Sequence, residues 1–193
     1  MTPRIAETAK GLWMVYLGVT IACMLAFRWA GMTWFDAVCH TFSTMGLGGF
    51  STHDASFGYF NSPTIEFVAI VFMLIAGMNF GTLFLAVHGR SIRPYFNDPE
   101  AGWFIGITLL SIFFIAVYIW KDGIYPDLDT AMRHVAFNLV SIATTTGYAS
   151  VDFALWPIFA PLWMLFLSSF VTSAGSTGGG IKMIRALLLY KQV

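Results

Sequence analysis

Two short glycine-containing loops interrupt the hydrophobic segments of this sequence at matching places. The first covers residues 43–51 (Ser-Thr-Met-Gly-Leu-Gly-Gly-Phe-Ser), and the second covers residues 143–150 (Ala-Thr-Thr-Thr-Gly-Tyr-Ala-Ser). Each follows a stretch that is too short to cross a bilayer, and each precedes a long apolar segment. Irregular backbone at membrane depth persists only where protein buries it or where it lines a watery cavity. Backbone carbonyls in such a place are the ligands that a dehydrated cation needs, so the loops indicate an ion pathway.

The composition indicates a membrane protein. Hydrophobic residues make up 58% of the chain and charged residues only 10%, whereas a soluble domain carries about 25% charged residues. Segments long enough to cross a hydrocarbon core of about 30 Å cover residues 11–31, 64–88, 101–120 and a last stretch that begins near residue 154. The net charge of zero gives no indication of nucleic-acid binding. We therefore expect the lipid bilayer as a partner and no nucleic acid.

The placement of charge orients the chain, because cytoplasmic loops carry an excess of Lys and Arg. With a cytoplasmic N-terminus and four crossings, seven of the ten basic residues fall inside and both termini are cytoplasmic. Seven of the ten acidic residues then lie outside, where they would concentrate cations at a pore mouth. Solvated loops with no functional field explain these counts equally well.

The chain divides into two similar halves, residues 1–98 and residues 99–193. Each half has a spanning helix, a short re-entrant helix, a glycine loop and a second spanning helix. Aligning Gly49 with Gly147 matches the halves at a period of 98 residues. Such repeats are common in transport proteins, where a pathway forms between equivalent units. The sequence predicts an all-α membrane protein with two helix–pore loop–helix repeats, potassium-channel-like, with four transmembrane helices and two re-entrant pore helices.

The short helices, expected at residues 34–43 and 131–141, have recognisable starts. Thr33 and Asp36 fit a capping box, and Asp127 can cap the second helix. Each helix would direct its C-terminal carbonyls, which carry partial negative charge, at the loop that follows. An amphipathic helix lying on the outer surface is the alternative in both cases.

The loops have the composition of a selectivity filter. Successive carbonyls that face one axis require unusual backbone angles, which glycine tolerates, and threonine adds hydroxyl ligands. Phe50 and Tyr148 follow the shared glycine and are expected to wedge each loop in place. The residues predicted to coordinate potassium are Met45, Gly46, Leu47, Gly48, Gly49, Thr144, Thr145, Thr146 and Gly147.

The last apolar stretch is too long for one crossing helix. Three consecutive glycines break it, because they do not sustain a helix. Below the filter, this segment would form a flexible gate; a simple exit loop is the alternative, since residues 154–173 can already span the membrane. Lys182 and Arg185 are expected to begin a short basic helix at the interface. The predicted gate consists of Gly175, Ser176, Thr177, Gly178, Gly179 and Gly180.

The remaining polar residues do not form an enzyme motif. His53 and His134 belong to no HExxH pattern, and no Ser/His/Asp set has suitable spacing, so we expect no enzymatic activity. Cys23 and Cys39 are interpreted as packing residues, and a disulfide or metal-binding role is the alternative. Asn79 is expected inside a helix, where it lines the pathway or bonds to a neighbouring helix.

Three runs resemble bacterial Trk-type potassium-uptake membrane subunits of the Trk/Ktr/HKT superfamily: residues 40–56, 143–148 and 174–182. In that family four helix–loop–helix repeats surround one pore, the four loops form the filter, and a glycine-rich intramembrane loop in the third repeat acts as a gate. This chain looks like the second and third repeats. The resemblance implies potassium transport, as symporter or channel, in the bacterial inner (plasma) membrane, with the potassium ion as ligand and no organic cofactor.

The resemblance also implies partners. Either a homo-oligomer or the missing repeats of the same parent chain would complete the pore, and a cytoplasmic nucleotide-binding subunit would regulate it. Loop 89–100 is a candidate contact for such a subunit, or a plain solvated turn. The alternative to transport is a non-conducting membrane fragment or structural assembly subunit whose loops only pack.

Overall fold

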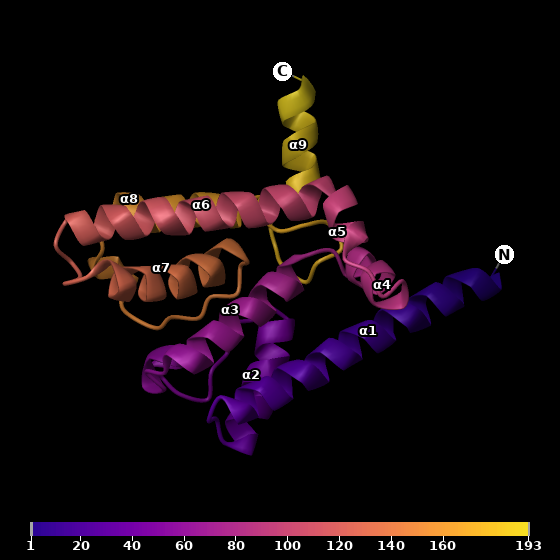
Figure 1. Ribbon diagram of the computed structural model, residues 1–193, viewed down its shortest axis with the longest axis horizontal. Coiled ribbons are helices and arrows are strands. Elements are labelled where there is room, and N and C mark those ends of the chain that lie inside the picture. Colours follow the sequence, from indigo (N-terminus) through magenta and orange to yellow (C-terminus); the bar gives the residue numbers. More distant parts are fainter. Residues whose placement is uncertain (1, 193) are drawn as a thin grey trace.

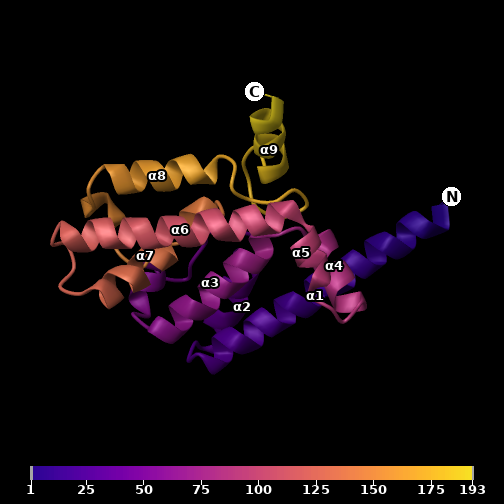
Figure 2. The same ribbon diagram turned by 45° about the horizontal axis from the view of Figure 1, so that its top comes forward.

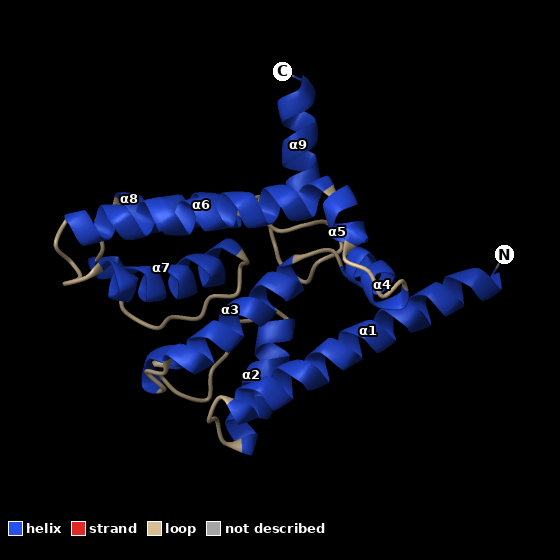
Figure 3. Cartoon of the chain, viewed as in Figure 1, coloured by secondary structure: helices blue, strands red, loops and turns tan. Residues whose placement is uncertain are grey.

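The protein is helical throughout the part that the structure describes. This computed structural model describes residues 2–192, and no strand occurs among them (Figure 3). Two short 3-10 turns cover Ser56–Tyr59 and Phe153–Leu155. The α-helices are α1 (Thr2–Trp29), α2 (Trp34–Met45), α3 (Pro63–Gly77), α4 (Phe80–His88), α5 (Arg93–Asn97), α6 (Pro99–Lys121), α7 (Leu128–Ala143), α8 (Phe159–Ser168) and α9 (Met183–Gln192).

Two of the predicted crossings are continuous helices. Within α1 and α6, the segments Ala6–Trp29 and Pro99–Lys121 are long and apolar enough to span a bilayer. Many of their large apolar side chains are exposed to the surroundings, as expected for helices that face lipid. Bulky residues such as Trp29 and Phe114 therefore need no protein partner.

The prediction of one continuous helix over residues 64–88 is wrong. The segment splits into α3 and α4, which are bent by 99° at residues 78 and 79. Asn79 lies at this break and not inside a helix, and its side-chain oxygen accepts from the Gly81 amide at 2.7 Å to cap α4. The apolar pattern contains no signal for the break, because hydrogen bonds to a distant loop stabilise it.

The last crossing is interrupted as the glycines predict. It consists of α8, an irregular stretch over residues 169–182, and α9. Counting the bent α3–α4 pair as one span, the described residues provide up to three spanning elements by length and composition, against four expected crossings, of which the last was expected to be interrupted.

The short helices α2 and α7 lie among the longer ones. Helix α2 contacts α1 and α3, while α7 contacts α3, α6 and α8. Figure 1 shows α7 alongside α6, and the turned view in Figure 2 separates α8 from α6, which covers it in Figure 1. Each short helix therefore packs against longer helices of the same chain. Their starts agree with the sequence, since Thr33 and Asp127 accept from the amides of Asp36 and Thr130.

One ion pair joins the two halves. Arg133 on α7 donates two hydrogen bonds to the Glu66 carboxylate on α3, at 2.9 and 2.7 Å, and a third to Asn61 at 3.2 Å. Glu66 is only 2% exposed. Two parallel guanidinium–carboxylate bonds fix direction as well as distance, so this pair sets the orientation of α7 against α3.

Candidate functional site: two filter-like loops above a glycine-rich segment

The first loop begins where α2 ends. Gly46 has right-handed angles (φ −84°, ψ −6°), whereas Leu47 and Gly49 have positive φ values of 50° and 70°. The Leu47 amide donates to Thr44 O at 3.2 Å, and the Gly48 amide donates to Ser43 O at 2.8 Å. Alternation of handedness turns successive peptide planes, which is the backbone property that a carbonyl-lined filter requires.

The second loop repeats this backbone 98 residues later. Thr144 has φ −81° and ψ 1°, and Thr145 and Gly147 have positive φ values of 64° and 93°. The Thr145 amide donates to Ile142 O at 2.9 Å, and the Thr146 amide donates to Ser141 O at 2.8 Å. Each bond has its counterpart in the first loop at the same offset, so the period inferred from glycines extends to backbone geometry.

The two loops touch at Gly49. A Cβ atom on Gly49 would lie 2.2 Å from the Thr146 carbonyl oxygen, so no larger residue fits there. Gly46, Gly48 and Gly147 are exposed, whereas Leu47 and Thr146 are buried. The glycines of both loops therefore leave backbone accessible while the side chains between them anchor it.

The aromatic residues after the shared glycine differ from one another. Tyr148 is fully buried, and its hydroxyl lies 3.2 Å from Thr44 Oγ1 and donates to His40 O at 3.2 Å, so the second loop is braced against α2. Phe50 is 81% exposed. The expectation that it wedges the first loop is not met among the described residues, which provide no pocket for its ring.

The threonine hydroxyls do not all face the loops' open side. Thr144 Oγ1 donates to Val140 O at 2.7 Å and lies 2.8 Å from Thr146 Oγ1, so both hydroxyls bond within the second repeat. Thr145 Oγ1 instead accepts from the Gly179 amide at 2.7 Å. Sequence reasoning assigned all three hydroxyls to ion binding, yet each has a protein partner here.

The glycine-rich segment lies directly against both loops. Thr177 Oγ1 donates to Met45 O at 2.9 Å in the first loop, and the Gly179 amide reaches Thr145 in the second. A Cβ on Gly178 would lie 3.1 Å from Thr144 O. These contacts exclude a free exit loop, and they engage the Met45 carbonyl, one of the predicted ion ligands.

The glycine-rich segment and the residues just before it hydrogen-bond to the break between α3 and α4. The Ser173 and Thr177 amides donate to Gly77 O and Ala76 O at 3.0 and 3.2 Å, and the Phe80 amide donates to Gly175 O at 3.2 Å. Peptide groups left unpaired at the α3–α4 break therefore form hydrogen bonds with those left unpaired in the stretch between α8 and α9. Figure 1 shows this loop passing the end of α3 before α9 begins.

Two charged residues also hydrogen-bond to the glycine-rich segment, and sequence reasoning predicted neither contact. Glu100, at the start of α6 and 7% exposed, accepts from the Ala174 amide at 2.6 Å. Lys182 donates to Gly178 O and, at 3.2 Å, to Ser176 Oγ. Its amine therefore binds the glycine-rich segment and is not the interface anchor that we expected. Helix α9 begins one residue later. A lone Glu and a lone Lys give no signal in a sequence without their spatial partners.

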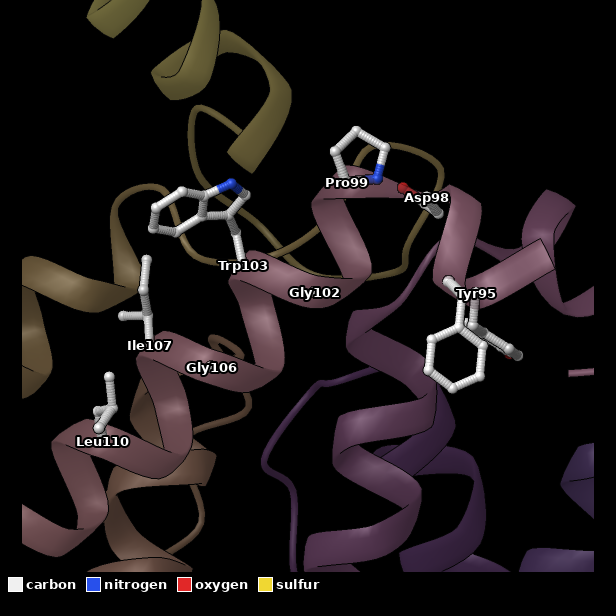
Figure 4. A pocket seen from close by; sticks show the side chains of 9 residues that line it. Tyr95, Asp98, Pro99, Gly102, Trp103, Gly106, Ile107 and Leu110 are labelled. Carbon is white, nitrogen blue, oxygen red and sulfur yellow. The ribbon is translucent and has the colours of Figure 1, made fainter. Parts of the chain in front are cut away.

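Other candidates lie apart from the loops. An open groove of about 520 Å³ follows α5 and α6, where Trp103, Ile107 and Leu110 project from one helix face (Figure 4). None of its nine lining residues belongs to either glycine-containing loop or to the glycine-rich segment. Cys23 and Cys39 are free thiols, and within residues 2–192 no group of three or more His, Cys, Asp or Glu side chains could hold a metal ion.

Comparison with known proteins identifies the family. Residues 1–193 match the TrkH family of cation transport proteins over their whole length. The chain belongs to this family. Among its TrkH-family relatives, the Trk system potassium uptake protein TrkH of Salmonella typhimurium is 49% identical over 193 residues, and TrkG of Escherichia coli is 41% identical over 192 residues. These relatives are named as uptake proteins and not as enzymes.

A solved structure of the TrkH family has the same fold. The crystal structure of the potassium transporter TrkH from Vibrio parahaemolyticus aligns with all of this chain at a TM-score of 0.94 and 49% sequence identity. The expected family and the all-α membrane fold are therefore confirmed. The chain covers 42% of that structure and about 40% of the Salmonella relative, so it corresponds to less than half of a TrkH-family protein.

Proposed function

We propose that this chain supplies half of a potassium pathway, in which the two loops coordinate a dehydrated cation and the glycine-rich segment controls passage. The observation that carries the proposal is the recurrence of the same right-handed, left-handed alternation at residues 46–49 and 144–147, in two loops that touch. Potassium can exchange its water shell for carbonyl oxygens with little net cost where several carbonyls face one axis.

The coordinating groups would be backbone oxygens of Met45–Gly49 and Thr144–Gly147. Potassium is the ligand in this proposal and no organic cofactor is required. The helices α2 and α7 end at the loops, so the partial negative charge at their C-termini favours a cation there. The relatives named as potassium uptake proteins support this choice of ion.

The gate would be the segment Gly175–Gly180. Its bonds to Met45 and Thr145 hold it against both loops, where a passing ion must displace it. Four of its six residues are glycines, so such a movement would need to break the side-chain bonds of Ser176 and Thr177 but unpack little else. In this proposal, these bonds correspond to a closed state of the gate.

The chain would lie in the bacterial inner membrane with both termini cytoplasmic, as the basic residues favour. Either the remaining repeats of the parent protein or a second copy of the chain would supply the missing half of the pore. A cytoplasmic nucleotide-binding subunit would regulate passage, with loop 89–100 as a candidate contact.

The test is ion flux into liposomes that contain the purified chain, comparing K⁺ with Na⁺. Selective K⁺ flux means that copies associate to complete a pore. No flux from protein that is folded and inserted means that the missing repeats are required, and favours the non-conducting alternative for this chain by itself.

A matched pair of variants tests the loop assignment in a conducting assembly. Gly147 and Gly123 both have positive φ, 93° and 78°, and an added Cβ meets nothing within 4 Å at either. Gly147→Ala should reduce the preference for K⁺ over Na⁺ at least about tenfold, since a shifted carbonyl changes ion coordination. Gly123→Ala, between α6 and α7, should leave it unchanged. Equal selectivity in both variants would refute the filter assignment.

A further inference from the structure

His40 and Asn138 occupy equivalent positions, 98 residues apart, in the middle of the two short helices. Both side chains are fully buried. Neither residue belongs to a loop. Yet each makes the same kind of contact, in two directions.

Each side chain bonds first to its own helix. His40 Nδ1 lies 2.8 Å from Asp36 O, and Asn138 Nδ2 donates to His134 O at 2.8 Å. Because a carbonyl oxygen only accepts, His40 Nδ1 carries the proton. In the neutral ring, Nε2 is then an acceptor. One end of each side chain is thereby fixed to the residue one helical turn earlier.

Each side chain bonds next to the serine that follows its loop. His40 Nε2 accepts from the Ser51 hydroxyl at 3.0 Å, and Asn138 Nδ2 donates to Ser150 Oγ at 3.0 Å. Asn138 Oδ1 also accepts from the Ser150 amide at 3.2 Å. The two serines are one residue apart at this period, because residue 149 is Ala, so different residue types with opposite donor direction make a similar but not identical connection in the two repeats.

We infer that His40 and Asn138 are positioning residues, each tying the chain that leaves its loop back to the short helix that leads into it. A loop fixed at both ends cannot change the spacing of its carbonyls freely. Cation coordination depends on that spacing and rigidity, so the inference deepens the proposed function and rests on it for the link to potassium. The tie itself is a property of the fold that can be measured separately.

Each loop exit has further hydrogen bonds besides those of His40 and Asn138, and these bonds differ between the repeats. The first loop's exit has a second tie, because Thr52 Oγ1 donates to Asp36 Oδ1 at 2.6 Å. In the second repeat the residue equivalent to Asp36 is His134, whose Nδ1 is buried with no hydrogen-bond partner in the described part of the chain. That loop's exit is held instead by Ser141 Oγ, which donates to Tyr148 O at 2.7 Å, and by the Ala149 amide, which donates to Ser56 Oγ at 3.3 Å. Because Asn138 makes two bonds to Ser150 and His40 makes one to Ser51, loss of Asn138 should loosen its loop more than loss of His40.

The experiment is hydrogen–deuterium exchange of the purified 193-residue chain in lipid nanodiscs, followed over residues 46–53 and 144–152. Asn138→Leu should speed exchange in the second loop about tenfold and leave the first within twofold, since one hydrogen-bonded tie is lost. His40→Leu should speed exchange in the first loop about threefold only. His40→Asn should restore part of the lost protection, because an amide at this position can bond to Thr52, the counterpart of Ser150.

Val135→Ala is the matched control, since it removes buried volume from the same helix α7 and takes away no side-chain hydrogen bond. It should lower the unfolding temperature without a selective change in either loop. The inference is overturned if Asn138→Leu matches this control, if both loops respond equally to one variant, or if His40→Asn behaves as His40→Leu.

Repeating the exchange in KCl and in NaCl separates the inference from the proposed function. Potassium should slow exchange in both wild-type loops more than sodium does, and Asn138→Leu should reduce that difference in the second loop. A wild-type chain that shows no potassium effect would count against ion coordination by these loops in the isolated chain, while the variants would still decide whether the ties exist.

Discussion

The two repeats have the same loop backbone but different surroundings. Both loops alternate in handedness at the same offsets, and both follow a short capped helix. The second loop is braced by buried Tyr148, whereas Phe50 of the first is exposed. The outgoing helix breaks over residues 78–79 in the first repeat and over residues 169–182 in the second. Local geometry thus follows local sequence, while bracing and breaks depend on what packs beside each repeat.

The largest expected loss of stability comes from substitution of Gly49, and the equivalent Gly147 provides the comparison. Gly49→Ala meets a carbonyl oxygen at 2.2 Å as well as a positive φ, whereas Gly147→Ala meets only the positive φ. Left-handed backbone costs about 1–2 kcal/mol for alanine, and overpacking adds about 1–3 kcal/mol. Denaturant unfolding in detergent should show Gly49→Ala to be the more damaging, by at least about 1 kcal/mol. Equal losses would mean that the loops do not touch at Gly49.

The ion pair between the repeats should give the next largest effect. Arg133→Gln leaves the Glu66 carboxylate buried without its partner, and the expected loss of unfolding free energy is about 2–3 kcal/mol, given that the arginine is partly exposed. Adding Glu66→Gln should recover part of this loss. Arg28→Gln is the control, since no carboxylate pairs with Arg28 within residues 2–192; its side chain donates to Met32 O at 3.3 Å and lies 5.5 Å from the Trp34 ring. If the double variant is less stable than Arg133→Gln, the pair does not join the halves as described.

The aromatic difference predicts a smaller effect. Tyr148→Phe removes a hydroxyl that bonds to α2, at an expected cost of about 1 kcal/mol. Phe50→Leu in the isolated chain should change stability by less than about 0.5 kcal/mol, because the ring is exposed. Thermal unfolding of both variants measures the contrast. A larger loss from Phe50→Leu would show that copies of the chain already cover this ring.

The caps of the short helices predict the smallest effect, and it depends on pH. Thr33 caps α2 with a hydroxyl, whereas Asp127 caps α7 with a carboxylate. Hydrogen bonds from the Thr130 amide and hydroxyl hold the pKa of Asp127 below its usual value, which is about 4. The charged cap therefore stabilises the fold above that usual value and loses its effect as pH falls through the lower folded pKa. Unfolding temperatures of wild type and Asp127→Asn should differ at pH 7 and converge as the pH falls through the lowered folded pKa. If the unfolding temperatures still differ at low pH, the charge of Asp127 does not account for the effect of the cap.

The sequence by itself determined the class of protein and the positions of its loops. Hydrophobic composition, the caps at Thr33 and Asp127 and the recurrence of glycine predicted helices, two short helices and the interruption of the last span. These features are local, because a cap or a positive-φ position is specified by the residue that occupies it. The resemblance of three motifs then identified the family that the comparisons confirm.

Only the tertiary structure decided how the loops are held. The bend at Asn79, the burial of Tyr148 and the contacts of Glu100 and Lys182 with the glycine-rich segment join residues far apart in the chain. The positioning residues His40 and Asn138 share no residue type, so no motif connects them. Hydrogen bonds of this kind depend on three-dimensional placement, and a one-dimensional pattern of polarity does not encode which buried polar group meets which partner.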